Sequence, residues 1–199
     1  MWTENFRQLA HYNGWANERL YAHVERLDEG SRKASREMYG GSIDGLLHHL
    51  LISDGLTMAT LTDDASGFRP RNRLGEAIQI ESLIQCLYPV YSELWTARVH
   101  LDKQLVEFTA TLTDAELNDM IAFFDFNGER HKMRRFQLLT ELFSHQQHHR
   151  GQLTAVLHGI KRPLGTLDFT SFLQSTDAVT GMSEARDAGK VNNRGGALR

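Results

Sequence analysis

The sequence predicts an all-α protein of four long helices, with a small β-hairpin before the last of them. Two observations support this prediction. Apolar residues recur at gaps of three and four along four long segments, which is the spacing of one face of a helix. Between the last two segments the apolar residues become contiguous and an Asn-Gly pair follows, which is the strongest short signal for a hairpin turn.

A polar loop separates the first two predicted helices. Apolar residues keep to one stripe over residues 6–27, which predicts the first helix. Residues 28–41 break this pattern and contain two adjacent glycines, so we expect a loop there. Ser42 can accept a hydrogen bond from the first turn of the second helix, which is expected to reach about Leu61.

The third predicted helix is long and contains a proline. Its leucine stripe covers residues 81–112, and Pro89 lies inside it. Because proline removes a backbone donor and its ring clashes with the preceding turn, the helix should kink or restart there. Thr113 and Glu116 have the spacing of a capping box, which predicts a short extra turn after this helix.

A hairpin and a last long helix complete the predicted fold. Residues 121–126 and 129–133 are expected to pair as two strands, because both residues of the intervening Asn-Gly pair tolerate the positive φ of a tight turn. The last long helix is expected over residues 135–157. Gly159 follows it and is expected to form a left-handed cap.

A single domain is expected over residues 1–177, with a tail behind it. Residues 166–173 can form one further short element of this domain. Residues 178–199 are mostly small, polar and charged, and they offer little surface to bury. We therefore expect this tail to be mobile.

Composition excludes several classes of protein. The chain has 199 residues, of which 41% are hydrophobic, enough for a sizeable core without disulfides. Its 22 basic and 25 acidic residues argue against a nucleic-acid partner, since such proteins usually show a basic excess. The single cysteine, Cys86, excludes an internal disulfide. No signal-peptide pattern or membrane-span pattern is present, so we expect a cytoplasmic protein without a membrane partner.

Two histidines occupy the middle of the core-facing stripe of the last helix. His145 and His149 are one turn apart, so they diverge by only about 40° around the helix axis. Leu138 and Val156 lie about 20° from His145 on the same face, whereas His148 points about 60° to the other side. Because buried imidazoles need polar partners, a shared metal ion would explain this pair.

The pair alone is a weak motif. His-x-x-x-His recurs by chance, and Gln146 occupies the position where zinc proteases of the His-Glu-x-x-His type carry their glutamate base. Protease chemistry of that type is therefore not expected. A catalytic metal site typically has three protein ligands and one open position. The third ligand can come from His48 or His49 in the second helix, and periodicity does not choose between them.

Three motifs, in the expected order, resemble the DinB-like family of metal-binding four-helix bundles, the DinB/YfiT type. Residues 12–17 read Tyr-Asn-Gly-Trp-Ala-Asn, similar to that family's Tyr-Asn-x-Trp-Ala-Asn. His49 and Asp54 are similar to its His-x-x-x-x-Asp motif, whose histidine is a ligand. Residues 145–152 match the family's strongest motif, in which two histidines four apart are ligands. The resemblance spans about residues 6–172.

The resemblance implies a four-helix bundle with an unusual helix order and a metal site made by His49, His145 and His149. It thus selects His49 over His48. It implies one divalent transition metal ion, with zinc or nickel favoured and iron or manganese open, since imidazole binds several of these metals. It also implies a homodimer and a small-molecule substrate, such as a low-molecular-weight thiol.

We expect a metal-dependent enzyme, either a hydrolase or a thiol transferase, with water or a substrate thiol in the open position. The alternative is a non-catalytic stress-response or binding module with a structural metal. No general base is identified. Glu141 and Gln152 flank the stripe, and solvated charge or packing is the more ordinary role for them. Arg150 is expected to make a structural or interface salt bridge, and Cys86 to be a small core residue.

Overall fold

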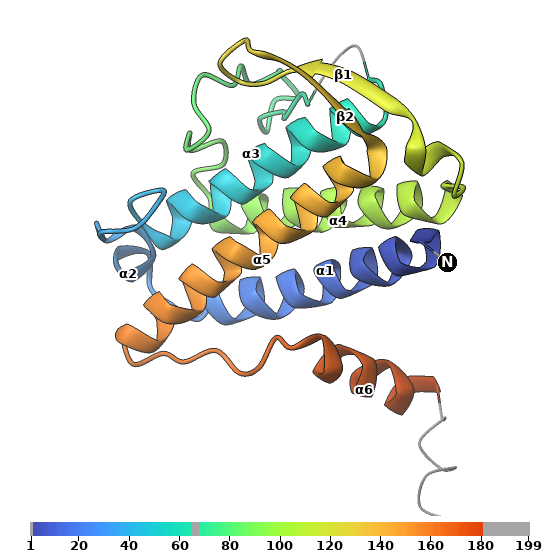
Figure 1. Cartoon of the computed structure of the whole chain (residues 1–199). Helices are drawn as coiled ribbons and strands as arrows, with labels where there is room; N and C mark the ends of the chain where they lie inside the picture. Colours follow the sequence, from blue (N-terminus) through green and yellow to red (C-terminus); the bar gives the residue numbers. More distant parts are fainter. Residues whose placement is uncertain (1, 65–67, 181–199) are drawn as a thin grey trace, which may run out of the picture. The chain divides into compact units, whose positions relative to one another are not determined.

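Four long helices form the bundle, as the sequence predicts (Figure 1). They are α1 (Trp2–Val24), α3 (Ile43–Leu61), α4 (Tyr91–Thr111) and α5 (Arg135–Gly159). The computed structural model describes residues 2–64 and 68–180. No helix in this described part of the chain is both long and apolar enough to cross a membrane.

The order of the helices around the bundle differs from their order in the sequence. Both α1 and α3 pack against α4 and α5, so α1 and α3 lie diagonally opposite each other. The neighbours α3 and α4 run in the same direction (Figure 1). Parallel neighbours in a bundle need a long crossover connection. The chain between α3 and α4 provides it, and its described residues 81–90 bring backbone groups to α3 that the site below uses.

Leucines from all four long helices form the core. Leu20, Leu47, Leu94 and Leu153, one from each helix, are completely buried. Burying such a side chain typically stabilises a fold by about 1.5–3 kcal/mol. Helix α3 is buried on nearly every side, and both His48 and His49 are less than 5% exposed. This all-round burial explains why periodicity alone does not choose between them.

The third long helix is shorter than predicted. Helix α4 begins at Tyr91, and residues 81–90 form a loop, so the prediction of a helix from residue 81 is wrong. Pro89 is the physical reason, since a helix can restart after a proline but does not continue easily through it. Cys86 lies in this loop and is exposed, so the prediction that it is a core residue is also wrong.

A short helix, α2 (Glu29–Lys33), interrupts the first predicted loop. Asp28 caps it by accepting a hydrogen bond from the Ser31 amide at 2.8 Å. The sequence pattern did not predict this single turn. The predicted start of α3 is confirmed, since the Ser42 hydroxyl accepts a hydrogen bond from the Gly45 amide at 3.0 Å.

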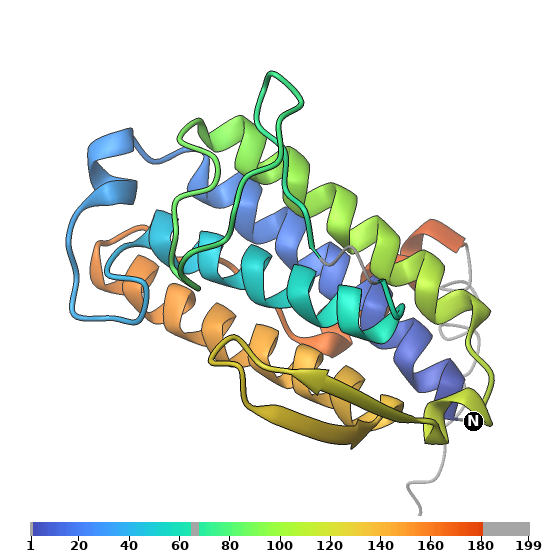
Figure 2. The same cartoon turned by 90° about the horizontal axis from the view of Figure 1, so that it is seen from above.

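The predicted hairpin is present as β1 (Met120–Phe124) and β2 (Arg130–Arg134), an antiparallel pair. Strand β1 contacts α3 and β2 contacts α5, and Figure 2 shows the hairpin lying along these helices. Its turn differs from the predicted two-residue type. Gly128 has a φ of 82°, whereas Asn127 is outside the left-handed region. Asp125 accepts hydrogen bonds from the Asn127 and Glu129 amides, both at 2.9 Å, and so stabilises a longer turn.

The capping box before the hairpin is also confirmed. The Thr113 amide donates to the Glu116 carboxylate at 2.8 Å, and the Glu116 amide donates back to the Thr113 hydroxyl at 3.3 Å. The short 3-10 helix η1 (Glu116–Asn118) begins there. This turn separates α4 from the hairpin, as the sequence predicts.

The last long helix ends two residues later than predicted. Gly159 is still helical, and Lys161 is the left-handed residue, with a φ of 61°. The Arg162 amide closes the helix end by donating to the Leu157 carbonyl at 2.9 Å. In a helix end closed by such a hydrogen bond, the left-handed residue lies one or two positions past the helix. Glycine is the commonest residue at this position, but other residues also occupy it.

A second compact unit begins at Gly165. Its described part contains α6 (Phe169–Thr180), which begins later and extends further than the short element predicted over residues 166–173. The tail predicted over residues 178–199 lies outside the described residues from position 181 onward. The domain boundary after residue 177 therefore stays a prediction.

Candidate metal centre

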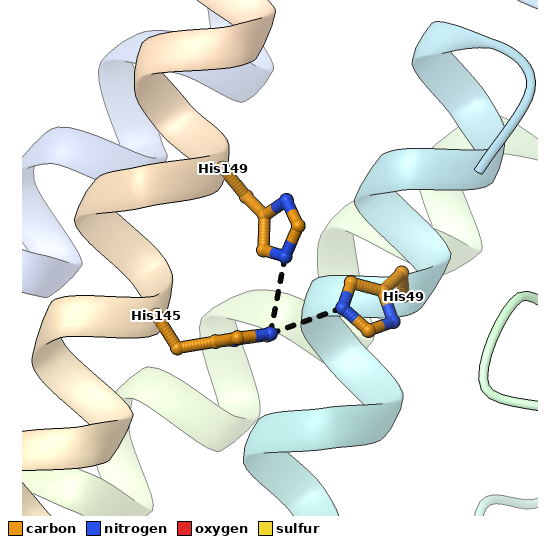
Figure 3. A group of neighbouring side chains, drawn as sticks. All are labelled: His49, His145 and His149. Atoms are coloured by element: carbon orange, nitrogen blue, oxygen red, sulfur yellow. Dashed lines mark hydrogen bonds between the residues drawn. The ribbon is translucent and has the colours of Figure 1, made fainter. Parts of the chain in front are cut away.

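Three histidines from two helices meet between α3 and α5. His49 extends from α3, and His145 and His149 extend from adjacent turns of α5, so that the rings face one another (Figure 3). The Nε2 atom of His145 lies 3.0 Å from Nε2 of His49 and 3.1 Å from Nε2 of His149. The structure thus brings together the three side chains that the sequence analysis selected.

Second hydrogen bonds fix the tautomer of two of these rings. The Nδ1–H group of His49 donates to the Leu83 carbonyl at 3.0 Å. The Nδ1–H group of His149 donates to the Gln152 side-chain oxygen at 2.8 Å. Because a neutral imidazole carries one hydrogen only, Nε2 of each ring keeps its lone pair and directs it toward His145. Acceptors of this kind orient metal-binding histidines in many proteins.

The arrangement fits a shared ion better than a hydrogen-bonded cluster. Nε2 of His145 has either one hydrogen or one lone pair, so it can serve only one of its two close neighbours. A metal ion would accept all three lone pairs. Imidazole nitrogens lie about 2.0–2.1 Å from zinc, so two ligands at angles near 90–110° are roughly 2.9–3.4 Å apart. Both observed separations fall within this range.

Burial keeps the cluster in the neutral form that binds metals. Burial, together with the neighbouring rings of His149 and His49, lowers the pKa of His145 to about 4. Burial also lowers the pKa of His49 and His149, although their hydrogen bonds to Leu83 and Gln152 oppose the shift. The rings therefore need not lose a proton at neutral pH before they bind a metal.

Two neighbouring histidines lie outside the cluster. His48 is buried, but its Nδ1–H group donates to the Asp44 carbonyl at 2.7 Å and its Nε2 accepts from the Tyr88 amide at 3.2 Å. Both nitrogens of His48 are thus satisfied by the protein itself. His148 is exposed, and its ring centroid lies 4.9 Å from that of His149.

Gln152, Glu141 and Arg150 of α5 take different roles. Gln152 orients His149, whereas Glu141 is exposed. Arg150 is 4% exposed and structural, as expected. It donates to the side-chain oxygens of Asn13, Asn17 and Gln146, so the expected salt bridge is replaced by hydrogen bonds to amides.

Tyr39, which no sequence motif pointed to, lies over the cluster. Its ring centroid is 4.5 Å from that of His49 and 5.5 Å from that of His149, and the residue is 46% exposed. The next residue, Gly40, has a φ of 79°, and a Cβ there would lie 2.6 Å from the Leu46 amide nitrogen. The loop can therefore pack closely on the start of α3 only with glycine at this position. The glycine pair predicts a loop, but nothing local predicts that Tyr39 faces the site.

Comparisons with known proteins agree with this fold. The sequence matches the DinB family over residues 1–186. The fold is similar to the crystal structure of a DinB-like protein from Bacillus cereus ATCC 10987, with 17% identity, a TM-score of 0.52, and coverage of 76% of this chain and 90% of that chain. No curated protein matches the chain. The structural likeness shows the fold alone, but the sequence match covers nearly the whole chain, which therefore belongs to the DinB family.

Proposed function

We propose that this protein is a metal-dependent enzyme in which His49, His145 and His149 hold one divalent transition metal ion. The main support is the convergence of three Nε2 atoms, with Nδ1 of two rings engaged elsewhere. Zinc and nickel are the favoured metals, and iron and manganese remain open, because imidazole binds all of them.

The proposed chemistry is hydrolysis or the transfer of a low-molecular-weight thiol. A bound divalent ion would lower the pKa of a water molecule or thiol in an open position toward neutrality. Three neutral imidazoles leave the charge of such an ion uncompensated, so they favour an anionic nucleophile. The half-exposed ring of Tyr39 covers the cluster and can contact the substrate.

Cobalt substitution tests whether the site has an open position. The protein without a histidine tag would be loaded with one equivalent of Co²⁺ and titrated with 2-mercaptoethanol. An open site predicts a change in the visible cobalt bands and a new thiolate-to-cobalt charge-transfer band. Azide, a small anion that binds open metal positions, would be added as a second probe. A spectrum that neither 2-mercaptoethanol nor azide changes would contradict the enzyme proposal. The His145→Ala variant serves as the control without a site.

The second candidate is a stress-response or binding module with a structural metal. Four protein ligands are usual in structural zinc sites, whereas the described residues bring three histidines together. This difference favours the enzyme. We further expect that the protein binds a small molecule and no nucleic acid. We also expect a homodimer, which light scattering of the purified protein would test by measuring its mass.

A further inference from the structure

A buried hydrogen bond joins α3 to α5 beside the three histidines. The side-chain amide of Gln146 donates to the carboxylate of Asp54, and the two residues are 0% and 2% exposed. Gln146 directly follows His145, and Asp54 lies five residues after His49. The two helices that carry the histidines are thus joined by a directional contact in the core.

The other two long helices hold Asp54 in place. Arg98 of α4 donates to Asp54 at 2.8 Å and to Asp102 at 2.8 Å, and it is only 1% exposed. Asn13 and Asn17 of α1 donate to Asp102, both at 3.1 Å. All four helices therefore meet in one set of buried polar contacts, and Asp54 cannot move without disturbing the others.

Gln146 is held at both ends of its amide. Its nitrogen donates to Asp54, and its oxygen accepts from Arg150 at 3.1 Å. Arg150 also donates to Asn17 at 3.2 Å, which ties the same turn of α5 to α1. The orientation of this turn is therefore set by several directional contacts in addition to the apolar packing.

Stability alone does not explain these buried charges. Burial raises the pKa of Asp54 to about 6, although Arg98 opposes the shift. Desolvating such charges is costly, and well-packed apolar residues are often as stable as a buried ion pair. The best-attested use of a buried polar group is to fix the register of packed helices. Register is also the property on which a metal site between two helices depends.

We infer that the Asp54–Gln146 hydrogen bond fixes the register of α5 against α3 and so positions His145 and His149 opposite His49. A slide of one residue moves a helix by about 1.5 Å. Metal–ligand distances tolerate changes of only about 0.2 Å. Contacts between leucines are non-directional, so they oppose a small slide of α5 along α3 only weakly. The same slide would break the Asp54–Gln146 hydrogen bond, which depends on distance and angle. The inference rests on the proposed metal centre, and it makes Asp54 and Gln146 positioning residues.

Metal affinity measured on the full-length protein tests this inference. The variants are Gln146→Met, Asp54→Ala and their combination, and the measurement is the dissociation constant of Zn²⁺ in competition with a chromophoric chelator. Each single variant should bind at least about tenfold more weakly, the lower end of the loss that follows when a residue that orients metal ligands is replaced. The double variant should bind Zn²⁺ hardly more weakly than the single variant with the lower affinity, because both changes remove the same hydrogen bond.

Two controls separate positioning from stability. Gln147→Met makes the same change at the adjacent, exposed residue of α5, and Leu105→Ala opens a cavity in α4. Both should keep the wild-type affinity within about twofold, and Leu105→Ala should do so despite a lower Tm. If Asp54→Ala fails to fold, Gln146→Met decides the test, because it leaves Asp54 paired with Arg98.

The outcomes distinguish this inference from the proposed function. Wild-type affinity in Gln146→Met would overturn the register role while leaving the metal centre intact. Equal weakening by Leu105→Ala would also overturn it, because any loss of stability would then suffice. A wild-type protein that binds no zinc would overturn both the metal centre and the register role.

Discussion

Gln152 accepts a hydrogen bond from the Nδ1–H group of His149 at 2.8 Å. This contact leaves the lone pair of Nε2 of that ring directed at the histidine cluster. We expect Gln152→Leu to weaken metal binding about 10- to 100-fold, the usual effect of removing such a partner. Competition with a chelator would measure it, with Gln147→Leu on the exposed side of α5 as the control. Equal affinities in the two variants would contradict the role of Gln152.

Replacing any one of the proposed ligands should remove most of the bound metal. His49→Ala, His145→Ala and His149→Ala should each lose most bound metal, because two imidazoles hold a divalent ion poorly. His48→Ala should keep the metal but lose about 1–3 kcal/mol of stability, because it leaves the Asp44 carbonyl and Tyr88 amide without their partner. Elemental analysis of the four variants and thermal unfolding would check this. Equal metal content in all four would refute the assignment.

Acidification should destabilise the metal-free protein. The pKa of His145 falls to about 4 in the folded chain, from about 6.5 in the unfolded chain. Between these values the unfolded chain binds protons that the folded chain does not. The free energy of unfolding should therefore decrease as the pH falls through this window. Urea unfolding at several pH values would measure the slope, which should be shallower in His145→Ala. An unchanged slope in that variant would contradict the prediction.

The ring of Tyr39 should slow the escape of metal. The ring lies within 4.5–5.5 Å of two of the histidine rings, so it shields one side of the cluster. Tyr39→Ala should release zinc to a chelator faster than the wild type, whereas Tyr39→Phe should match the wild type, because the ring provides the shielding. Stopped-flow measurement of release would compare the three proteins. Release from Tyr39→Ala at the wild-type rate would show that the ring does not shield the metal site.

Local patterns predict much of this fold and part of its site. The helical stripes, the Ser42 cap, the Thr113 capping box and the Asn-Gly hairpin all depend on residues close in the sequence. The pairing of His145 with His149 is equally local, because both lie on one helix face. The predictions of these features are confirmed because each depends on neighbouring residues, although some helix and strand boundaries and the type of the hairpin turn were wrong.

Contacts set by the crossover between α3 and α4 were not predictable from local patterns. Leu83 was expected inside a helix, where its carbonyl would accept from a later turn, yet it accepts from His49. The choice of His49 over His48 came from a family resemblance, since α3 is buried around most of its surface. Arg98 and Asp54 likewise meet because α4 packs against α3, a contact between residues 44 positions apart in the sequence.

The central claim is that three histidines bind one transition metal ion, and elemental analysis by plasma mass spectrometry tests it most directly. The protein would be purified without a histidine tag and analysed before and after incubation with zinc and with nickel, followed by removal of free metal. The account predicts about one equivalent of metal per chain and loss of most of it in His145→Ala. A folded wild-type protein that contains no metal and takes up neither zinc nor nickel would contradict it.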